Sequence, residues 1–457
     1  MELNNQHIVV VGLARSGLAV ARFLKSRGAQ VTVTDQALEE NLGLFAQQAR
    51  ELGIDLELGG HSDSLFESAA MIVISPGVPH TIAALEAARK RGISVMGEIE
   101  LAVRFITTPI IAVSGTNGKT TTTELIGQIL TAAGKRVYVG GNIGRPLIDA
   151  AGHDKDLDLI VAEISSFQLD TIEQFRPHVA VLLNITADHL DRYPSMAAYA
   201  ESKGRLFINQ TADDFAVCHG TDGWVQSQCA KAKSCLLNFY TRPPQNAAVD
   251  QGVIITPRQI IAILPGRPEA RIDLTQTALK GPHNRENIAA ASLAALAVGI
   301  DVERIQQTID EFRPLAHRLE PVATINGIHF VNDSKATNVD AVIRALECYH
   351  QPVVLIMGGR NKGYDFNLLT EQVRKRVKKL IVIGEAGPEI LRALAHAPEQ
   401  GAETAADLDQ AVRQAYASAT PGDTVLLSPA CASFDMFTSY TDRGETFRRS
   451  VNGLPEL

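Results

Sequence analysis

The apolar residues of this chain fall into short continuous runs, separated by segments in which they recur every three or four positions. The first run is His7–Val11, followed by a helix-like pattern over Leu18–Arg27 that ends at Gly28. A continuous apolar run predicts a buried strand, and a spacing of three to four residues predicts an amphipathic helix. Because strands alternate with helices, we expect an α/β protein with parallel, doubly wound sheets.

The alternation falls into three blocks, which we interpret as domains covering residues 1–97, 98–314 and 315–457. A chain of 457 residues is too long for one hydrophobic core. The further strands that we expect are Gln30–Thr34, Met71–Ser75, Ile110–Val113, Arg136–Val139, Leu157–Ala162, His178–Leu183, Ile328–Val331, Val353–Met357, Lys379–Ile383 and Thr424–Leu427. The stretch 218–275 is strand-like but irregular and indicates no particular chemistry.

The most informative segment is PIIAVSGTNGKTTTT at residues 109–123. An apolar strand runs into a glycine loop, Gly115-Thr116-Asn117-Gly118, and Lys119 and Thr120 begin a helix-like stretch. Such a loop presents backbone N–H groups and a helix N-terminus to an anion. The lysine adds charge for the outer phosphates, and the threonine hydroxyl can ligate Mg²⁺. Val113 replaces the first glycine of the usual pattern, so we predict a shortened phosphate loop that binds ATP rather than a simple tight turn.

The first block contains GLARSG at residues 12–17, and Asp35 follows the next expected strand. This arrangement resembles a dinucleotide-binding fingerprint, which would indicate an NAD-dependent dehydrogenase. However, Ala14 replaces the middle glycine that lets a pyrophosphate approach the backbone. The alternative is that the loop holds the diphosphate of another nucleotide, with Asp35 near its base or ribose.

Two acidic segments follow the phosphate loop, each at an expected strand end. Glu163 would face Thr120 across the edge of the sheet, where a carboxylate suits Mg²⁺. Asp188 and His189 lie in TADHLDRYP, where a metal or phosphate role competes with simple ordering of the loop. These residues are candidates for the ATP-dependent chemistry.

Further along, Lys203 lies in a stretch, Met196–Phe207, that could be helical, and pattern alone predicts a solvated lysine there. Asn284 and Asn287 lie three residues apart at an expected helix start. Their amides could read an adenine edge, although helix capping would explain one of them.

Charge and cysteine content restrict the class of protein. The net charge of −8 argues against nucleic acid as the main partner. The five cysteines are Cys218, Cys229, Cys235, Cys348 and Cys431, with no CxxC pair. We expect reduced thiols in a soluble, cytoplasmic protein rather than a disulfide framework, and scattered positions rather than a zinc site at the first three. No apolar run approaches the ~20 residues that a membrane helix needs, so no membrane insertion is expected.

The motifs GTNGKTT, EISSFQL (163–169), NITADHLDRY (184–193), HNRENIAAA (283–291), HR (317–318) and NDSKATN (332–338) resemble the Mur ligase family across nearly the whole chain. These enzymes build the peptide stem of bacterial peptidoglycan. Within the family, VNDSKATN, SPACASFDMF (428–437) and the GLARSG/Asp35 block resemble the members that add D-glutamate. No segment matches the DNPR-type motif of the diamino-acid-adding ligases.

The resemblance implies a Rossmann-like N-terminal domain, a central phosphate-loop ATPase domain and a Rossmann-like C-terminal domain. It implies amide formation through an acyl phosphate, with ATP and Mg²⁺, from UDP-N-acetylmuramoyl-L-alanine and D-glutamate, and we expect a monomer. The alternatives are another amino-acid-adding Mur ligase, a folylpolyglutamate synthase-like enzyme, a dehydrogenase, or a regulatory phosphate-loop switch.

The resemblance also implies site residues. ATP would contact Gly115, Thr116, Asn117, Gly118, Lys119, Thr120, Thr121, Asn287, Arg318 and Asp333. The UDP substrate would contact Arg15, Ser16, Asp35, Gly77, Asn142, Ser165 and His189. D-glutamate would contact Lys335, Thr337, Lys362, Ser433 and Tyr440. Catalysis and metal binding would involve Lys119, Thr120, Glu163, His189 and Lys203.

Two positions depart from some relatives, and a third is modified in the family. Ala37 stands where some relatives have arginine near the uracil, and Tyr440 stands where some have phenylalanine. The D-glutamate-adding enzymes carry a lysine carbamylated by CO₂ in the register of Lys203. That modification converts an ammonium into an anionic oxygen ligand of the kind that Mg²⁺ prefers.

Overall fold

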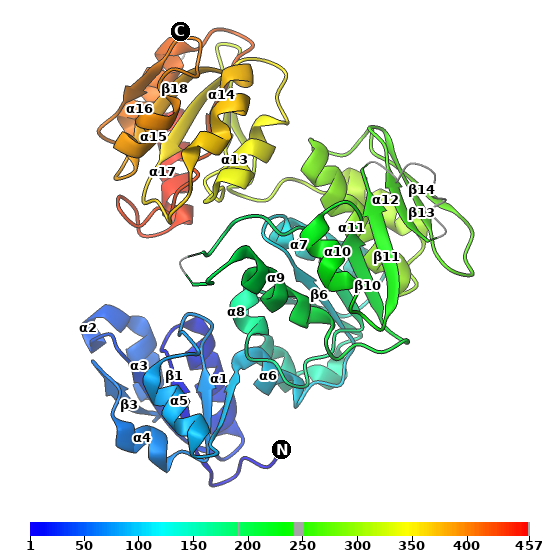
Figure 1. The fold of residues 1–457 in the computed structure, drawn as a ribbon, viewed down its shortest axis with the longest axis vertical. Helices are drawn as coiled ribbons and strands as arrows, with labels where there is room; N and C mark the ends of the chain where they lie inside the picture. The colour runs from blue at the N-terminus through cyan, green and yellow to red at the C-terminus, as the bar shows by residue number, and fades with distance from the viewer. Residues whose placement is uncertain (191, 242–250, 456–457) are drawn as a thin grey trace. The chain divides into compact units, whose positions relative to one another are not determined.

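The computed structural model describes residues 1–190, 192–241 and 251–455 (Figure 1). Asp191 of the NITADHLDRY motif lies outside this range. The chain forms two compact units, which are described separately. The first comprises Met1–Ile185, Ala197–Asp273 and Ile288–Thr308, and the second Thr186–Met196, Leu274–Asn287 and Ile309–Leu457.

The first sheet of unit one has five parallel strands in the order β3-β2-β1-β4-β5. Its strands are β1 (His7–Val11), β2 (Gln30–Asp35), β3 (Asp55–Leu58), β4 (Met71–Ile74) and β5 (Ser94–Gly97). Its helices are α1 (Arg15–Ser26), α2 (Glu39–Leu42), α3 (Leu44–Glu51), α4 (Asp63–Ser68), α5 (Ala83–Lys90) and α6 (Glu98–Val103). Val9 and Val11 pack with Phe66 of α4 and Leu85 of α5. Strand alternation turns Ile8 and Val10 to the opposite face, as the doubly wound prediction requires.

The second sheet of unit one has nine strands in the order β14-β13-β12-β11-β10-β9-β6-β8-β7. They are β6 (Ile110–Ser114), β7 (Val137–Gly141), β8 (Leu159–Glu163), β9 (Val179–Leu182), β10 (Phe215–His219), β11 (Cys235–Tyr240), β12 (Gly252–Ile255), β13 (Gln259–Ile263) and β14 (Ala270–Asp273). The irregular stretch after residue 218 is explained by a change of pairing, because β13 and β14 extend the parallel sheet with antiparallel strands.

The helices that accompany this sheet include α7, which follows the glycine loop, and several short 3₁₀ turns. Their bounds are α7 (Lys119–Ala132), η1 (Leu147–Gly152), η2 (Asp154–Asp156), α8 (Ser166–Leu169), α9 (Met196–Gly204), η3 (Arg205–Phe207), α10 (Gly223–Cys229), α11 (Pro282–Ala297) and α12 (Val302–Glu311). The division between the two units passes through α11 and α12.

Unit two contains a six-stranded sheet in the order β15-β16-β20-β17-β18-β19, parallel except for β15. Its strands are β15 (Glu320–Ile325), β16 (Ile328–Asn332), β17 (Val353–Gly358), β18 (Val377–Ile383), β19 (Ala402–Thr404) and β20 (Thr424–Leu427). Its helices are α13 (Val339–Leu346), η4 (Phe366–Leu369), α14 (Thr370–Arg376), α15 (Gly387–Leu394), α16 (Leu408–Ser418) and α17 (Tyr440–Asn452). Along β17, Leu355 packs in one core cluster and Ile356 in another, so this sheet is also covered on both faces.

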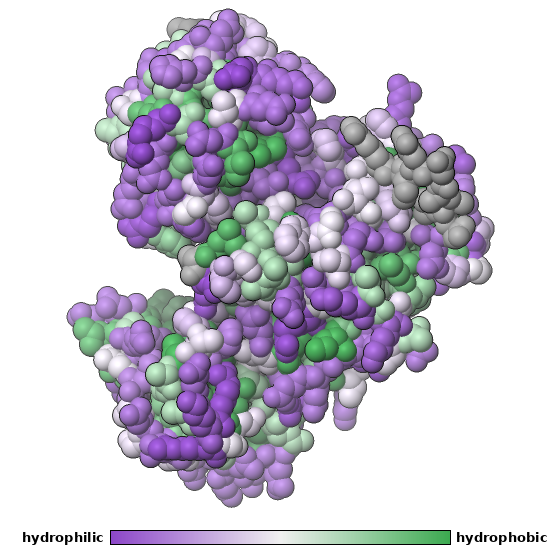
Figure 2. All heavy atoms as spheres, viewed as in Figure 1, coloured by the Kyte–Doolittle hydropathy of each residue, from purple (hydrophilic) through white to green (hydrophobic). Residues whose placement is uncertain are grey.

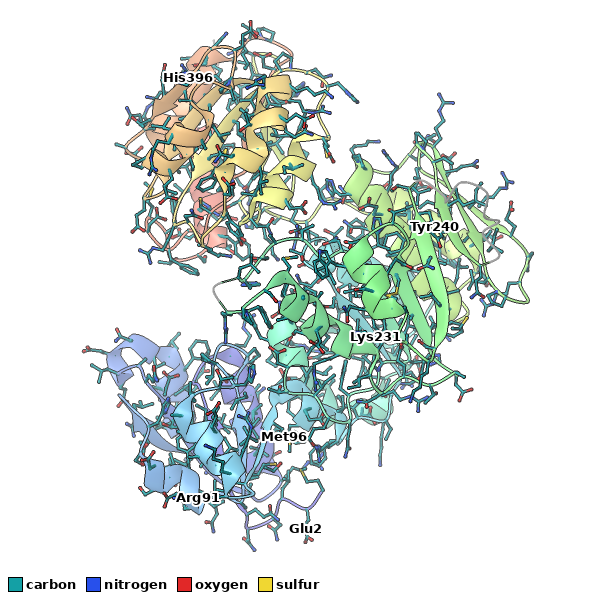
Figure 3. All side chains as sticks on the ribbon, in the orientation of Figure 1. Glu2, Arg91, Met96, Lys231, Tyr240 and His396 are labelled. Atoms are coloured by element: carbon teal, nitrogen blue, oxygen red, sulfur yellow. A yellow bond between two sulfur atoms is a disulfide. The ribbon has the colours of Figure 1, made fainter. Side chains whose placement is uncertain are left out.

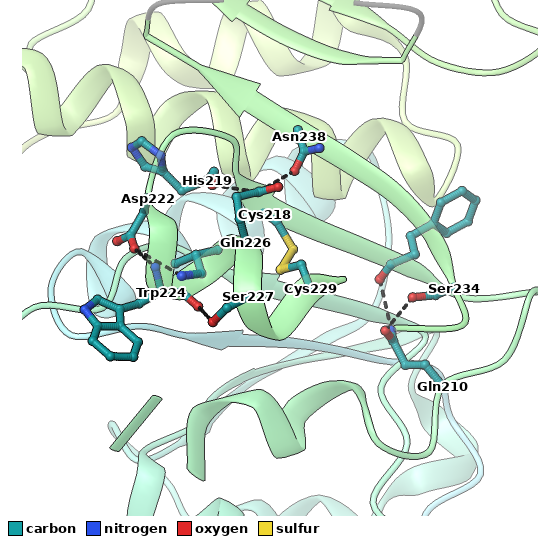
Figure 4. Close-up of a disulfide and its surroundings, with 12 residues drawn as sticks. Gln210, Cys218, His219, Asp222, Trp224, Gln226, Ser227, Cys229, Ser234 and Asn238 are labelled. Carbon is teal, nitrogen blue, oxygen red and sulfur yellow. Dashed lines mark hydrogen bonds between the residues drawn. A yellow bond between two sulfur atoms is a disulfide. The ribbon is translucent and has the colours of Figure 1, made fainter. Parts of the chain in front are cut away.

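The expectation of reduced thiols is wrong for one pair of cysteines. Cys218 on β10 and Cys229 at the end of α10 form a disulfide between two buried residues (Figure 4). Their separation of 11 residues in the sequence does not predict a disulfide. The two cysteines meet because α10, which Asp222 caps, folds back beside β10. Cys235 is a free thiol, and the described residues contain no cluster of three or more His, Cys, Asp or Glu suited to a metal ion.

On the face drawn in Figure 2, hydrophilic residues predominate and apolar ones form small separate patches. Within the described ranges, no helix has both the length and the apolar character needed to cross a bilayer.

A buried carboxyl group lies where the first sheet of unit one leads into the second. Glu98 begins α6 directly after β5, the strand of Met96, which is labelled in Figure 3. Its side chain is 2% exposed, and Oε1 accepts a hydrogen bond from the N–H of Ile148 at 2.7 Å. Burial raises the pKa of Glu98 to about 7, and the Ile148 hydrogen bond opposes this shift. The nearby Asp149 carboxylate raises the pKa further.

This pKa predicts a stability effect that depends on pH. A glutamate in the unfolded chain has a pKa of about 4.3. Between about pH 4.3 and about pH 7, Glu98 is therefore protonated in the folded state but ionised in the unfolded state. The stability of the protein falls as the pH rises through that window. As the pH is raised from about 5.5 to about 8, the free energy of unfolding of Glu98→Gln should increase by about 1–2 kcal/mol relative to that of wild type. Chemical denaturation at both pH values measures this gain, with exposed Glu86→Gln as the control. An equal difference from wild type at both pH values would contradict the assignment.

Candidate active site

The glycine loop joins buried strand β6 to helix α7, as the sequence predicts. Gly115 has φ of +147° and Gly118 has φ of +86°, and both conformations favour glycine. A Cβ on Gly115 would also lie only 3.0 Å from Cβ of Leu183 and 3.3 Å from the backbone N of Asn184. The loop therefore passes too close to the next strand end to accept a side chain.

Asn184, which follows β9, holds the loop from one side. Its carbonyl accepts the Thr116 N–H at 2.9 Å, and its Oδ1 accepts the Asn117 N–H at 2.8 Å. Its Nδ2 donates to the Asn117 carbonyl at 3.0 Å. Sequence reasoning missed this anchor, although Asn184 begins the motif NITADHLDRY.

Lys119 is the first residue of α7 and folds over the loop. Its Nζ donates to the carbonyls of Gly115 and Thr116, both at 2.8 Å. The ammonium thus lies beside the backbone N–H groups of the helix N-terminus. This combination of positive charge and N–H donors suits a phosphate group.

Thr120 and Glu163 come together at the carboxyl edge of the sheet, because β8 lies directly beside β6. Thr120 Oγ1 donates to Glu163 Oε2 at 2.7 Å, and Asn142 Nδ2 donates to Oε1 of the same carboxylate at 2.9 Å. Glu163 is 2% exposed. A buried carboxylate beside a hydroxyl oxygen is a donor set that fits Mg²⁺.

Lys203 is buried at 1% exposure, so the pattern-based expectation of a solvated lysine is wrong. It lies on α9, and its Nζ donates to the Gly115 carbonyl at 2.9 Å. The same nitrogen lies 4.7 Å from the ring centroid of Tyr199. A lysine on a separate helix thus contacts the phosphate loop itself.

A cavity of about 490 Å³ lies at the carboxyl ends of the strands in unit one. It brings together five predicted UDP-substrate residues, namely Arg15, Ser16, Asp35, Gly77 and Asn142. It is also lined by Ser75, Pro146 and Gln168, which the sequence interpretation missed. Of these, Gln168 lies within the motif EISSFQL, which could have pointed to it.

Asp35 and Ser165 have identifiable structural partners. The Asp35 carboxylate accepts the Leu13 N–H at 2.7 Å and the Ala37 N–H at 2.8 Å, so it orders the loop around the cavity. Ser165 does not line the cavity; it caps α8 through a reciprocal arrangement with Gln168. Its predicted contact would therefore be indirect in this arrangement.

In unit two, His189 has φ of +56°, and its Nε2 lies 3.6 Å from Asp188 Oδ2. Tyr364 donates a hydrogen bond from its hydroxyl to Asp188. The Asp188 carboxylate thus contacts the His189 ring, and the Tyr364 hydroxyl in turn positions that carboxylate.

Asn284 and Asn287 are buried on one face at the start of α11. Asn284 Nδ2 donates to the Lys280 carbonyl at 2.8 Å, and Asn287 Nδ2 donates to Asn284 Oδ1 at 3.2 Å. Asn284 therefore has a structural role and orients Asn287, the predicted adenine contact.

Asp333 follows β16 and is 7% exposed. Burial raises the pKa of Asp333 to about 7. Hydrogen bonds from the Ser428 hydroxyl at 2.9 Å and the Leu319 N–H at 3.2 Å act in the opposite direction and lower this pKa. The positive charge of Arg318 also lowers this pKa. Arg318 and Asp333, both predicted for ATP, thus lie close enough to interact electrostatically.

The five residues predicted for D-glutamate gather at the carboxyl edge of the unit-two sheet. They follow the adjacent strands β16, β20 and β17 or begin α17: Lys335, Thr337, Lys362, Ser433 and Tyr440. Lys335 Nζ lies 5.1 Å from the ring centroid of Tyr440. Ser433 is 2% exposed.

The glycine loop, its lysine and the adjoining acidic site define a phosphate-loop nucleotide-binding protein. Residues 6–97 match the Mur ligase MurD-like N-terminal domain, residues 113–295 the Mur ligase middle domain, and residues 317–431 the Mur ligase glutamate ligase domain. The chain belongs to the Mur ligase family.

Similar proteins extend over its whole length. A UDP-N-acetylmuramoylalanine–D-glutamate ligase from Desulfosudis oleivorans is 50% identical over 100% of this chain and 98% of its own. One of the same name from Desulfatibacillum aliphaticivorans is 49% identical over 100% of both chains. The solved structure of a pseudomurein peptide ligase type C from Methanothermus fervidus shares the fold, with a TM-score of 0.64 at 19% identity over 98% of this chain and 99% of that one.

Proposed function

We propose that this protein is an ATP-dependent ligase that joins D-glutamate to the L-alanyl carboxylate of UDP-N-acetylmuramoyl-L-alanine, a step of peptidoglycan precursor synthesis. The observation that carries the proposal is full-length identity of 49–50% to ligases of that name. The phosphate loop with its Thr120–Glu163 site supports the ATP dependence. We propose that it works as a cytoplasmic monomer with domains 1–97, 98–314 and 315–457, and with no nucleic-acid partner.

ATP would bind along the glycine loop. The amides of Gly115–Gly118, with Lys119 and the hydroxyls of Thr120 and Thr121, would hold its phosphates. Asn287 would contact adenine, Arg318 the phosphates and Asp333 the ribose. Thr120, Glu163, His189 and a carbamate on Lys203 would hold Mg²⁺, which neutralises phosphate charge when bound.

The UDP substrate would enter the 490 Å³ cavity. Arg15, Ser16, Asp35 and Gly77 would hold the uridine diphosphate, and Asn142 and His189 the muramoyl-alanine end. Ser165 would act on that end indirectly, through Gln168. The alanyl carboxylate would attack the γ-phosphoryl group and release ADP, forming an acyl phosphate. The amine of D-glutamate would then attack the acyl carbon, lose a proton and displace phosphate.

Lys335, Thr337, Lys362, Ser433 and Tyr440 would bind D-glutamate, whose two carboxylates need cations and hydroxyl donors. Because Ala37 replaces an arginine of some relatives, the uracil contacts at that position would differ from theirs. Tyr440 would add a hydroxyl to the glutamate pocket where some relatives have none.

Phosphate release across a panel of D- and L-amino acids tests the proposal. We expect release only when UDP-N-acetylmuramoyl-L-alanine and D-glutamate are both present. Release with an L-amino acid or a folate would favour another ligase of the family or a folylpolyglutamate synthase-like enzyme. Hydrolysis that is indifferent to amino acids would favour a regulatory switch, and tight NAD(H) binding would favour a dehydrogenase.

Two substitutions test the glutamate pocket. Ser433→Ala and Lys362→Ala should each raise the KM for D-glutamate by about 10-fold to 100-fold, because each removes a hydrogen bond to a charged carboxylate. The KM for ATP should change little. Initial rates with each substrate varied in turn measure both constants, and exposed Lys375→Ala is the control. Equal effects on both constants would assign these residues to domain closure instead.

A further inference from the structure

A fully buried arginine lies beneath the predicted glutamate pocket. Arg443, in the first turn of α17, is 0% exposed. The helix comes this close because Gly444 follows: a Cβ there would lie 2.2 Å from His317 Nδ1 and 3.0 Å from Asn332 Nδ2. None of the roles proposed above uses this guanidinium.

The Arg443 guanidinium joins three loops through its hydrogen bonds. Nε donates to Ser334 Oγ at 3.0 Å and Nη2 to the Ser334 carbonyl at 2.8 Å. Both Nη atoms donate to the Cys431 carbonyl at 3.1 Å, and Nη1 donates to the Gly358 carbonyl at 3.4 Å. Ser334, Cys431 and Gly358 lie at the ends of the adjacent strands β16, β20 and β17.

Each of these loops carries a predicted glutamate ligand a few residues away. Lys335 directly follows Ser334, and Ser433 and Lys362 lie close after Cys431 and Gly358. Ser334 Oγ also donates to the Tyr440 carbonyl at 2.8 Å. One planar, five-donor group therefore ties together the segments that would hold the amino acid, a geometry that lysine cannot reproduce.

The charge of this group forms no direct ion pair among the described residues, although the carboxylates of Asp435 and Asp333 act on it electrostatically. Its hydrogen-bond acceptors are neutral oxygens, namely the Ser334 hydroxyl and the carbonyls of Ser334, Cys431 and Gly358. Burial lowers the pKa of Arg443 to about 10, so it stays protonated at neutral pH. Substitution would consequently break no direct ion pair, and Asp333, which feels the charge of Arg443, would keep its hydrogen bonds from Ser428 and Leu319; both points favour a folded variant.

We propose that Arg443 is a positioning residue that sets the spacing of the three loops and thereby the affinity for the amino-acid substrate. This proposal rests on the proposed function for the identity of that substrate. The arginine acts through Lys335, Lys362, Ser433 and Tyr440 and does not itself touch the amino acid.

The test compares Arg443→Lys and Arg443→Ala with exposed Arg449→Ala on the same helix. We expect the KM for D-glutamate to rise by about 10-fold or more in Arg443→Lys and further in Arg443→Ala, with the KM for ATP within about 3-fold of wild type. Low millimolar guanidinium should partly restore the alanine variant. Parallel changes in every KM, or an unchanged KM in the lysine variant, would overturn the proposal.

Hydrogen exchange gives a readout that does not depend on activity. Amides of residues 333–338, 358–362 and 428–433 should exchange faster in Arg443→Lys than in wild type, while β18 and α16 stay protected. Unchanged exchange in these loops would overturn the positioning role. Absence of D-glutamate-dependent turnover in the wild type would instead contradict the proposed function and leave the exchange result to decide the role of Arg443. If Arg443→Ala does not fold, the lysine variant decides alone.

Discussion

Lys119→Ala is expected to lower turnover by about 10³-fold or more, because the side chain supplies the positive charge beside the ATP phosphates. In the structure, its Nζ donates hydrogen bonds to the loop carbonyls of Gly115 and Thr116, both at 2.8 Å. Loss of those bonds should cost about 1–2 kcal/mol of stability, so the variant should remain folded. Coupled phosphate release measures turnover, and thermal unfolding measures the fold.

Lys135→Ala provides the matched control, since Lys135 is an exposed lysine just beyond the other end of α7. It should keep wild-type turnover. Near-normal turnover of Lys119→Ala would show that the glycine loop does not bind the reacting phosphates.

Lys203→Ala is expected to lose about 10²-fold to 10³-fold in turnover, because a carbamate would supply oxygen ligands to Mg²⁺ that no other side chain replaces. Lys203→Arg, which keeps a positive charge but cannot form the carbamate, should be equally impaired. Short carboxylic acids should partly restore the alanine variant by supplying the missing oxygens. Turnover with and without these acids measures both effects.

The proposed carbamate can also be tested for directly. Wild-type protein depleted of CO₂ should lose activity and regain it with bicarbonate, and ¹³C-bicarbonate should give a carbamate signal that Lys203→Arg lacks. Exposed Lys233→Ala is the control and should respond to CO₂ as wild type does. Full activity of Lys203→Ala under CO₂-depleted conditions would eliminate the carbamate.

The phosphate loop could be predicted because its strand, glycines, lysine and threonine are contiguous in sequence. Glu163 could be placed opposite Thr120 because parallel strands end at the same edge of a sheet. Strand positions were also confirmed, with ends displaced by at most two residues; β18, for example, begins at Val377 rather than Lys379. Local pattern and strand direction are sufficient for features of this kind.

Features that depend on distant segments could not be predicted in the same way. The burial of Lys203 follows from packing of α9 against a loop that ends more than eighty residues earlier. Helix α1 begins at Arg15 rather than Leu18, because the glycine loop itself turns into the helix after the extended residue Ala14. The Cys218–Cys229 disulfide and the Arg443 network likewise require chain reversals that no spacing in the sequence reveals.

Isotope-resolved product analysis tests the central claim most directly. The purified protein would be supplied with ATP, Mg²⁺, UDP-N-acetylmuramoyl-L-alanine and an equal mixture of ¹⁵N-labelled D-glutamate and unlabelled L-glutamate. The account predicts a single new UDP-linked product in the mass spectrum, carrying the ¹⁵N label and formed in equal amount to the phosphate released. An unlabelled product, or phosphate release without product, would contradict it.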